Sequence, residues 1–179
     1  YFAVFGAFLD AKLPLPEGER VIAVQNSDIQ GGGSRQTLLD FVAWRDELKT
    51  VRDIAAFATA RRNLVLPERA VEHIEVVQMT ASGFRVARTA PFLGRLLLDE
   101  DEREGAPPVM VIGYEEWQRV FSGDRAVLGQ SVRVGGETYT VVGVMPPGFR
   151  FPLDHHYWVP LPLRMADIQS GAGQSFFTF

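Results

Sequence analysis

The sequence predicts an α+β fold for this chain of 179 residues. Three observations point to that class. Short runs rich in β-branched residues alternate with segments of helical spacing, and two adjacent glycines separate two strand-like runs near the C-terminal third. With 46% apolar and 22% charged residues, the composition is that of an ordinary globular protein. The chain is therefore apolar enough to build a core without disulfides or a structural metal.

Charge and cysteine content exclude several function classes. The chain has 18 Lys and Arg against 22 Asp and Glu, a net charge of −4, and no basic tract, so nucleic-acid binding is not expected. It has no cysteine, which excludes disulfides, thiolate catalysis and Cys-ligated zinc. The absence of cysteine is compatible with both oxidising and reducing compartments.

The first nine residues, YFAVFGAFL, form an unbroken apolar run. The run is too short to cross a bilayer, which takes roughly 20 residues, and it lacks the charged start and cleavage site of a signal peptide. It predicts either a buried first helix or the outer end of a transmembrane helix. In the second interpretation Asp10, Lys12 and the prolines at 14 and 16 mark the exit into water.

The next segments read as a strand, a loop and a helix. Residues 20–27 have the β-branched pattern of a strand. The glycine-rich loop 28–36 lacks the Lys of a phosphate-binding loop and predicts no nucleotide site. Helical spacing over residues 37–58 predicts a helix that Thr37 and Asp40 begin as a capping box. The side chains expected to make its apolar contacts are Leu39, Phe41, Trp44 and Leu48.

Residues 62–66 and 72–79 predict two strands separated by Pro67. A short helix is expected over residues 82–92, stopped near Pro91. The acidic run at 99–105 lacks the ligand spacing of a calcium loop, so it predicts a solvated surface loop.

The C-terminal half carries the most regular pattern. Residues 108–113 predict a buried strand, and 114–124 predict a helix that ends near Gly123, with Asp124 as the cap of the next turn. Residues 131–145 predict a β-hairpin in which Gly135 and Gly136 adopt positive φ. The prolines at 146 and 147 then end the ladder.

The sequence offers little for catalysis. Ser82 lacks the glycine-flanked setting of a nucleophile elbow. His155 and His156 are adjacent, so in a strand they face opposite sides and cannot share a metal; they are expected to be surface or turn histidines. We therefore predict no enzyme, and no catalytic, cofactor-binding or metal-binding residue.

The aromatic content allows a different function. Trp44, Trp117, Trp158 and thirteen phenylalanines sit mostly at core-like spacings. An exposed cluster left after the core is filled would favour a ligand-binding module for an apolar or peptidic substrate.

Residues 109–152, VMVIGYEEWQRVFSGDRAVLGQSVRVGGETYTVVGVMPPGFRFP, resemble the periplasmic core domain of MacB-type ABC transporter permeases, in the MacB/FtsX-like superfamily. The matching features are the helix with Trp117 and Phe121, the Gly123-Asp124 pair, the hairpin and the later YWVPL. Looser similarity upstream extends the resemblance over nearly the whole chain.

The resemblance implies a mixed sheet, with a βαβ-like porter lobe and a second β-rich lobe that contains the 131–145 hairpin. It implies that residues 1–12 are the outer end of a transmembrane helix. Residues 13–179 are then a periplasmic core domain, truncated at its C-terminal end, on the periplasmic side of the inner membrane.

The function implied is that of an extracytoplasmic domain of an export permease, which transmits conformational change across the membrane and contacts a partner or cargo. The chain has no Walker-type sequence, so the ATPase is expected on another segment or subunit. The other implied partners are a periplasmic adaptor protein, a second permease copy and the membrane, through flanking helices.

One further expectation concerns the two ends. Residues 176–179 are expected to pair beside residues 21–25, close to the point where residues 1–9 enter the membrane. Without a bilayer, residues 1–9 are expected to be disordered or to pack on a neighbouring molecule.

Overall fold

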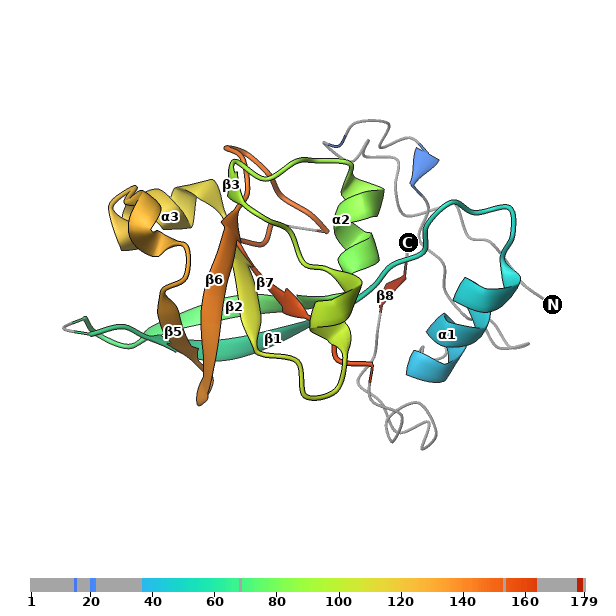
Figure 1. Cartoon of the computed structure of the whole chain (residues 1–179), viewed down its shortest axis with the longest axis horizontal. Coiled ribbons are helices and arrows are strands. Elements are labelled where there is room, and N and C mark those ends of the chain that lie inside the picture. The colour runs from blue at the N-terminus through green and yellow to red at the C-terminus, as the bar shows by residue number, and fades with distance from the viewer. Residues whose placement is uncertain are drawn as a thin grey trace.

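A computed structural model of the chain describes residues 15, 20–21, 37–67, 69–152, 154–163 and 177–178 (Figure 1). Its strands are β1 (Ala56–Val65), β2 (Glu72–Met79), β3 (Leu93–Gly94), β4 (Val109–Ile112), β5 (Ser131–Val134), β6 (Glu137–Val144), β7 (Tyr157–Pro160) and β8 (Phe177–Thr178). Its helices are α1 (Leu38–Glu47), α2 (Ala81–Ala87) and α3 (Tyr114–Phe121), with short 3-10 turns η2 (Asp99–Glu102) and η3 (Arg125–Val127).

The first helix begins as the sequence predicts and ends earlier. The Thr37 side chain accepts a hydrogen bond from the Asp40 backbone, and the Asp40 carboxylate accepts one from the Thr37 backbone, which confirms the capping box. The helix stops at Glu47, so the prediction of helix up to residue 58 was wrong. Leu38 is buried and Leu39 is 52% exposed, so the expected apolar contact of Leu39 was wrong too.

The end of that predicted helix belongs to β1, because long-range pairing overrides the local pattern. β1 pairs with β2 in antiparallel register from Phe57↔Met79 to Leu64↔Glu72. β2 has the bounds that the sequence predicts, whereas β1 begins six residues before its prediction (56 against 62).

Within the described residues, all the strands belong to one mixed sheet. β1, β2, β7, β4, β6 and β5 pair in that order, and β5 pairs again with β1, so the strands close into a ring. The β4–β6 and β2–β7 pairs are parallel and the other pairs of the ring are antiparallel. α3 lies between the parallel strands β4 and β6 in the chain, as in a βαβ unit, and the α+β class with a mixed sheet is confirmed.

The predicted hairpin is present and is part of this same sheet. β5 and β6 pair from Ser131↔Thr140 to Val134↔Glu137. Gly135 has φ +60° and Gly136 has φ +93°, so both take the left-handed conformation that a two-residue turn requires.

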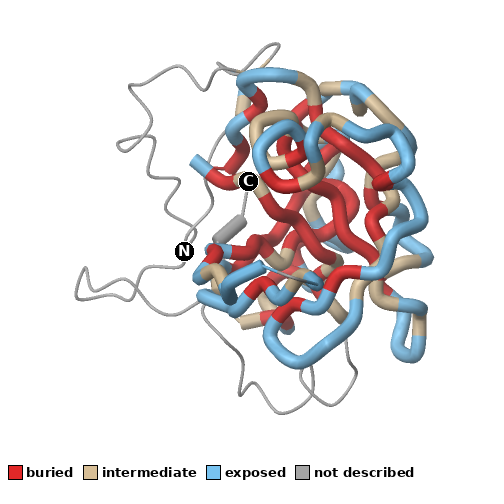
Figure 2. The backbone as a smooth tube through the Cα atoms, turned by 90° about the vertical axis from the view of Figure 1, so that its left-hand side faces the viewer, coloured by how far each residue is buried: buried red, intermediate tan, exposed pale blue. Residues whose placement is uncertain are grey.

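The sheet is buried on both faces. Met110 and Ile112 of β4 pack in one apolar cluster, while Val109 and Val111 pack in another, against α2. This two-sided burial explains why β4 reads as a continuous apolar run. Figure 2 shows the buried segments of the chain at the centre, enclosed by more exposed ones. A third cluster joins α1 to the start of β1 and contains Leu38, Phe41, Trp44, Ile54, Ala56, Ala58 and Leu161.

β8 pairs with the start of β1 in antiparallel register, Ala56↔Thr178 and Phe57↔Phe177. The predicted pairing with residues 21–25 lies outside the described residues, as do the loop 28–36 and residues 1–9. Of the predicted strand 20–27 only Arg20 and Val21 are described, and neither is in a strand. In the part of the chain that the structure describes, no helix has the length and apolarity to span a membrane.

Candidate functional site

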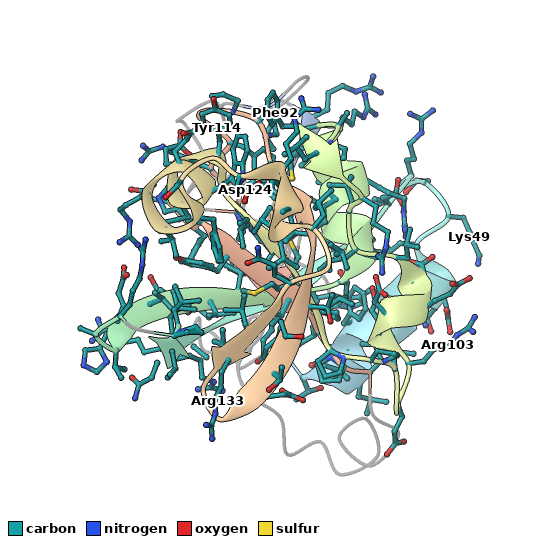
Figure 3. The ribbon with its side chains drawn as sticks, turned by 60° about the vertical axis from the view of Figure 1, so that its left-hand side comes forward. Lys49, Phe92, Arg103, Tyr114, Asp124 and Arg133 are labelled. Carbon is teal, nitrogen blue, oxygen red and sulfur yellow. The ribbon has the colours of Figure 1, made fainter. Side chains whose placement is uncertain are left out.

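A cavity of about 380 Å³ lies between α1, the segment that follows it, α2 and η2. We call it the α1–α2 groove. Its apolar walls include Phe41 of α1, Leu48, the residue that caps the C-terminus of that helix, and the exposed Val51. Its polar floor is at the N-terminus of α2. Figure 3 shows Lys49, two residues after the end of α1, and Arg103, the residue after η2, on the same side of the molecule. The lining residues are Phe41, Arg45, Leu48, Val51, Arg52, Asp53, Ile54, Thr80, Ser82, Arg85, Asp99, Glu102, Arg103 and Leu163.

Glu102 is the buried acid of the groove. It is 7% exposed, and its carboxyl oxygen Oε1 accepts a hydrogen bond from the backbone N–H of Ala81, the first residue of α2. Burial raises the pKa of Glu102 to about 7, and the hydrogen bond from Ala81 opposes this effect. The Glu102 carboxyl group therefore titrates near neutral pH.

The rest of the acidic run is also structured. The Asp101 carboxylate accepts two hydrogen bonds from the Arg95 guanidinium, at 2.6 and 3.0 Å, and a third from the Leu98 backbone at 2.8 Å. The prediction of a solvated loop was therefore wrong for Asp101 and Glu102. A run of like charges does not reveal which of its side chains are buried. A nearby arginine, Arg95, was the only sequence signal that one of these carboxylates has a partner in the fold.

An ion-pair bridge crosses the groove. Arg85 of α2 donates to Asp53 at 3.0 Å and to Asp99 at 2.8 Å. These contacts connect α2 with the segment after α1 and with η2. All three side chains are partly exposed, so these ion pairs contribute little to the free energy of unfolding. Their main effect is to hold α2, η2 and the segment after α1 in a fixed relative position.

The other three guanidinium groups of the groove differ in their contacts. Arg45 lies over the Phe41 ring, with 5.7 Å between its guanidinium carbon and the ring centroid, and its Nε lies 3.8 Å from Asp46 Oδ1. The side chains of Arg52 and Arg103 have no hydrogen-bond or ion-pair partner among the residues that the structure describes. The described lining has four arginines against three acids, so the groove is cationic in a chain of net charge −4.

Ser82 lies at the floor of the groove and has a structural environment. It is buried, and its Oγ is 2.8 Å from the Oγ1 of Thr80. Thr80 in turn accepts a hydrogen bond from the Ala56 backbone at 3.0 Å. The two hydroxyls therefore tie the start of α2 to the start of β1.

His155 and His156 lie in different environments, and the position of His155 differs from the sequence prediction. His155 is 4% exposed, so its interpretation as a surface or turn histidine was wrong; it lies just before β7, which is buried. Burial lowers the pKa of His155 although Glu75 is 3.8 Å from its Nε2. His156 Nε2 instead lies 3.5 Å from Asp154. Across the described ranges, no group of three or more potential metal ligands is found.

The tryptophans belong to the core, as the core-like spacing predicts. Trp44 and Trp117 are 5% exposed and Trp158 is fully buried. A smaller aromatic surface remains outside. Phe92 is 44% exposed and packs on Tyr114 and Trp117, at centroid distances of 5.2 and 5.6 Å.

This second feature, which we call the α3 surface, consists of the exposed Phe92, Tyr114 beside it, and the exposed Leu128, whose side chain lies next to Gly94, two residues after Phe92. Figure 3 shows Phe92 and Tyr114 together at the top of the view, away from Lys49 and Arg103 at the right. The sequence reasoning identified neither this surface nor the groove, since each is assembled from segments distant in the chain.

The fold is shared with extracytoplasmic domains of ABC transporters. The structure is similar to the periplasmic region of MacB from Actinobacillus actinomycetemcomitans, with a TM-score of 0.61 and 14% identity, over 86% of this chain and 70% of that one. It is also similar to the extracellular domain of the noncanonic ABC-type transporter YknZ from Gram-positive bacteria, with a TM-score of 0.60 and 16% identity, over 87% and 80% of the two chains. No curated protein sequence matches the chain.

The sequence itself shows the family. The model of the MacB-like periplasmic core domain matches residues 2–178, and the chain belongs to this family. It is thus an extracytoplasmic domain of a MacB-like ABC transporter permease, which confirms the resemblance found in residues 109–152. The family is a transporter permease domain and not an enzyme class, and it works in a system that includes an ABC ATPase.

Proposed function

We propose that this domain transmits conformational change in an export permease as a rigid lever, and that it contacts a partner protein or cargo through the α3 surface. The observation that carries the proposal is the β1–β2 ladder, which joins the two ends of the domain. β1 has ten residues, a length of about 30 Å at 3.4 Å per residue.

One end of the ladder holds α1 and β8, and we place the attachment to the flanking membrane segments there. β8 pairs with the first residues of β1, and the cluster around Phe41 packs α1 on the same strand. A displacement of either segment therefore acts directly on the start of β1.

The other end holds α3. Arg119 of α3 donates to Glu72, the first residue of β2, with Nη1 and Oε2 3.0 Å apart, and also to Glu116. Figure 1 shows α1 and α3 at opposite sides of the ring. Because the strands between them close on themselves, the domain can move as one body, as rigid-body transitions require.

A distance measurement on the whole transporter tests the lever. The chain has no cysteine of its own, so after any cysteines elsewhere in the transporter are replaced, spin labels at Lys49→Cys and Arg69→Cys, both exposed, report on the two ends of this domain. We expect the distance between the labels within one domain to be the same with and without ATP. The distance between Arg69→Cys labels of two permease copies should change.

A control pair at Lys49→Cys and Arg52→Cys, both near α1, should report no change in either condition. A nucleotide-dependent distance between positions 49 and 69 would contradict the rigid lever. An unchanged distance between the two copies would contradict transmission through this domain.

The α3 surface is our proposed contact for a periplasmic adaptor protein. Phe92→Ser with Leu128→Ser should weaken co-purification of the adaptor, because the substitutions remove the exposed apolar area. The control is Leu39→Ser with Val71→Ser, which removes apolar side chains of similar exposure elsewhere. If both double variants reduce co-purification equally, the contact is not at α3. The ligand-binding alternative is favoured by a different feature, the α1–α2 groove.

A further inference from the structure

We propose that the α1–α2 groove binds a small organic anion with an apolar body, such as a medium-chain carboxylate, whose anionic group lies between Arg52 and Arg103 and whose apolar part packs on Leu48 and Val51. This inference is independent of the lever and adds a ligand site to the domain.

The size of the groove sets the size of the ligand. A volume of 380 Å³ corresponds to roughly a dozen water molecules at about 30 Å³ each. That space suits a ligand of about ten non-hydrogen atoms and lies at the lower end of typical ligand pockets.

The apolar wall is contributed by separate elements. Phe41 comes from α1, Leu48, Val51 and Ile54 come from the segment that follows this helix, and Leu163 comes from the segment after β7. Phe41 and Ile54 are already buried, so a ligand in the groove would mainly shield the half-buried Leu48 and Leu163 and the exposed Val51 from water. Covering these side chains favours an apolar body over a fully hydrated ion.

The charges favour an anion. Arg85 donates hydrogen bonds to Asp53 and Asp99. Arg52 and Arg103 have no such partner among the described residues, so each guanidinium group can donate two parallel hydrogen bonds to a carboxylate of the ligand. A cationic ligand would instead meet the excess of arginines. The charge balance therefore selects against ammonium compounds of the same shape.

Glu102 makes the binding depend on pH. When its carboxyl group is protonated, the groove loses one of its three negative charges and an anion binds more strongly. Anion affinity should therefore rise as the pH falls from 8 to 6. The charged groups that face Glu102 from the surrounding elements are Arg45 of α1, Arg85 of α2 and Asp99 of η2.

Calorimetric titration of the purified chain with octanoate, below its micellar concentration, tests the site. Octanol and octylammonium serve as probes with the same tail and a neutral or positive head. We expect one saturable site for octanoate, with octanol and octylammonium at least tenfold weaker.

Two double variants separate the groove from general surface charge. Arg52→Gln with Arg103→Gln should weaken octanoate binding at least tenfold. The matched control, Arg125→Gln with Arg133→Gln, removes two exposed arginines outside the groove and should leave it unchanged. Thermal melts of both variants establish that each is folded.

Three results would overturn the site. These are the absence of saturable octanoate binding by the folded chain, octanol binding as strongly as octanoate, and equal effects of the two double variants. The Glu102→Gln variant gives a further readout. It should bind octanoate with the same affinity at pH 6 and 8, and a pH dependence as steep as that of the unmodified chain would refute the role of Glu102.

Discussion

Replacing Glu102 with glutamine should stabilise the domain at alkaline pH. The substitution keeps the length of the side chain and the oxygen that accepts the Ala81 N–H, and it removes the ionisable group. The variant therefore avoids the free-energy cost of removing a charged carboxylate from water when the domain folds.

The size of the effect follows from the pKa of Glu102. Its value rises from 4.5 to about 7 on folding, and at about 1.4 kcal/mol per pKa unit this corresponds to roughly 3 kcal/mol. Between these two pH values the folded state binds a proton that the unfolded state has released. Stability therefore falls as the pH rises from 4.5 to 7, and above pH 7 the full cost is present.

Urea denaturation at pH 5, 6, 7 and 8 measures this difference. The free energy of unfolding of Glu102→Gln, minus that of the unmodified chain, should increase by about 2–3 kcal/mol from pH 5 to pH 8. Any constant cost of packing an amide cancels in this comparison, and so does the titration of His155, which both proteins share.

The control is Glu104→Gln, an exposed neighbour in the same acidic run, which should show no pH-dependent difference. Parallel stability curves for Glu102→Gln and the unmodified chain across this range would refute the reasoning. Parallel curves would mean that ionising Glu102 costs no more free energy in the folded state than in the unfolded state, as for a hydrated carboxyl group.

Three other substitutions test the sheet, each by thermal or urea denaturation. Replacing Gly135 and Gly136 together by valine should cost about 1–3 kcal/mol, because both have positive φ; an unchanged melting temperature would contradict the hairpin turn. Gly143→Ala should cost about 1–3 kcal/mol, since the new Cβ would press on the backbone carbonyl of Arg95; a neutral result would mean that this loop is free to move. Trp158→Phe should cost about 2–4 kcal/mol, as the fully buried indole donates to a backbone carbonyl at 2.7 Å; a loss below 1 kcal/mol would argue that water replaces the donor.

The local elements were largely predictable because their signals lie within a few residues. The capping box at Thr37, the helix through Trp117, the cap at Asp124 and the turn at Gly135 each depend on contacts that a short window contains. The structure confirms all of them.

The start of β1 shows where local signals fail. Ala55, Ala56 and Phe57 continue an apolar helical pattern, and alanine favours helices. In the structure Phe57 pairs with Met79 on one side and Phe177 on the other, partners 22 and 120 positions away in the chain. No short window contains that information.

The groove was unpredictable for the same reason. Phe41, Asp53, Arg85 and Glu102 come from separate segments, and only the packing of α1 and α2 against β1 brings them together. The acidic run indicated charge at this place in the sequence, but which carboxylate enters the interior depends on the backbone of η2.

The groove and the lever meet at α1. The helix packs on the start of β1 through Phe41 and Trp44, and the same Phe41 lines the groove. A ligand that also contacts Glu102 would therefore stabilise the arrangement of α1, α2 and η2 in this structure. The rigid lever keeps this arrangement of α1 and α2 throughout transport, so the ligand has the same affinity for both states of the transporter. By linkage, such a ligand cannot shift the balance between those states. Octanoate bound to the whole transporter should therefore leave the nucleotide-dependent distance between the two permease copies unchanged, and an effect of octanoate on that distance would mean that α1 moves relative to α2.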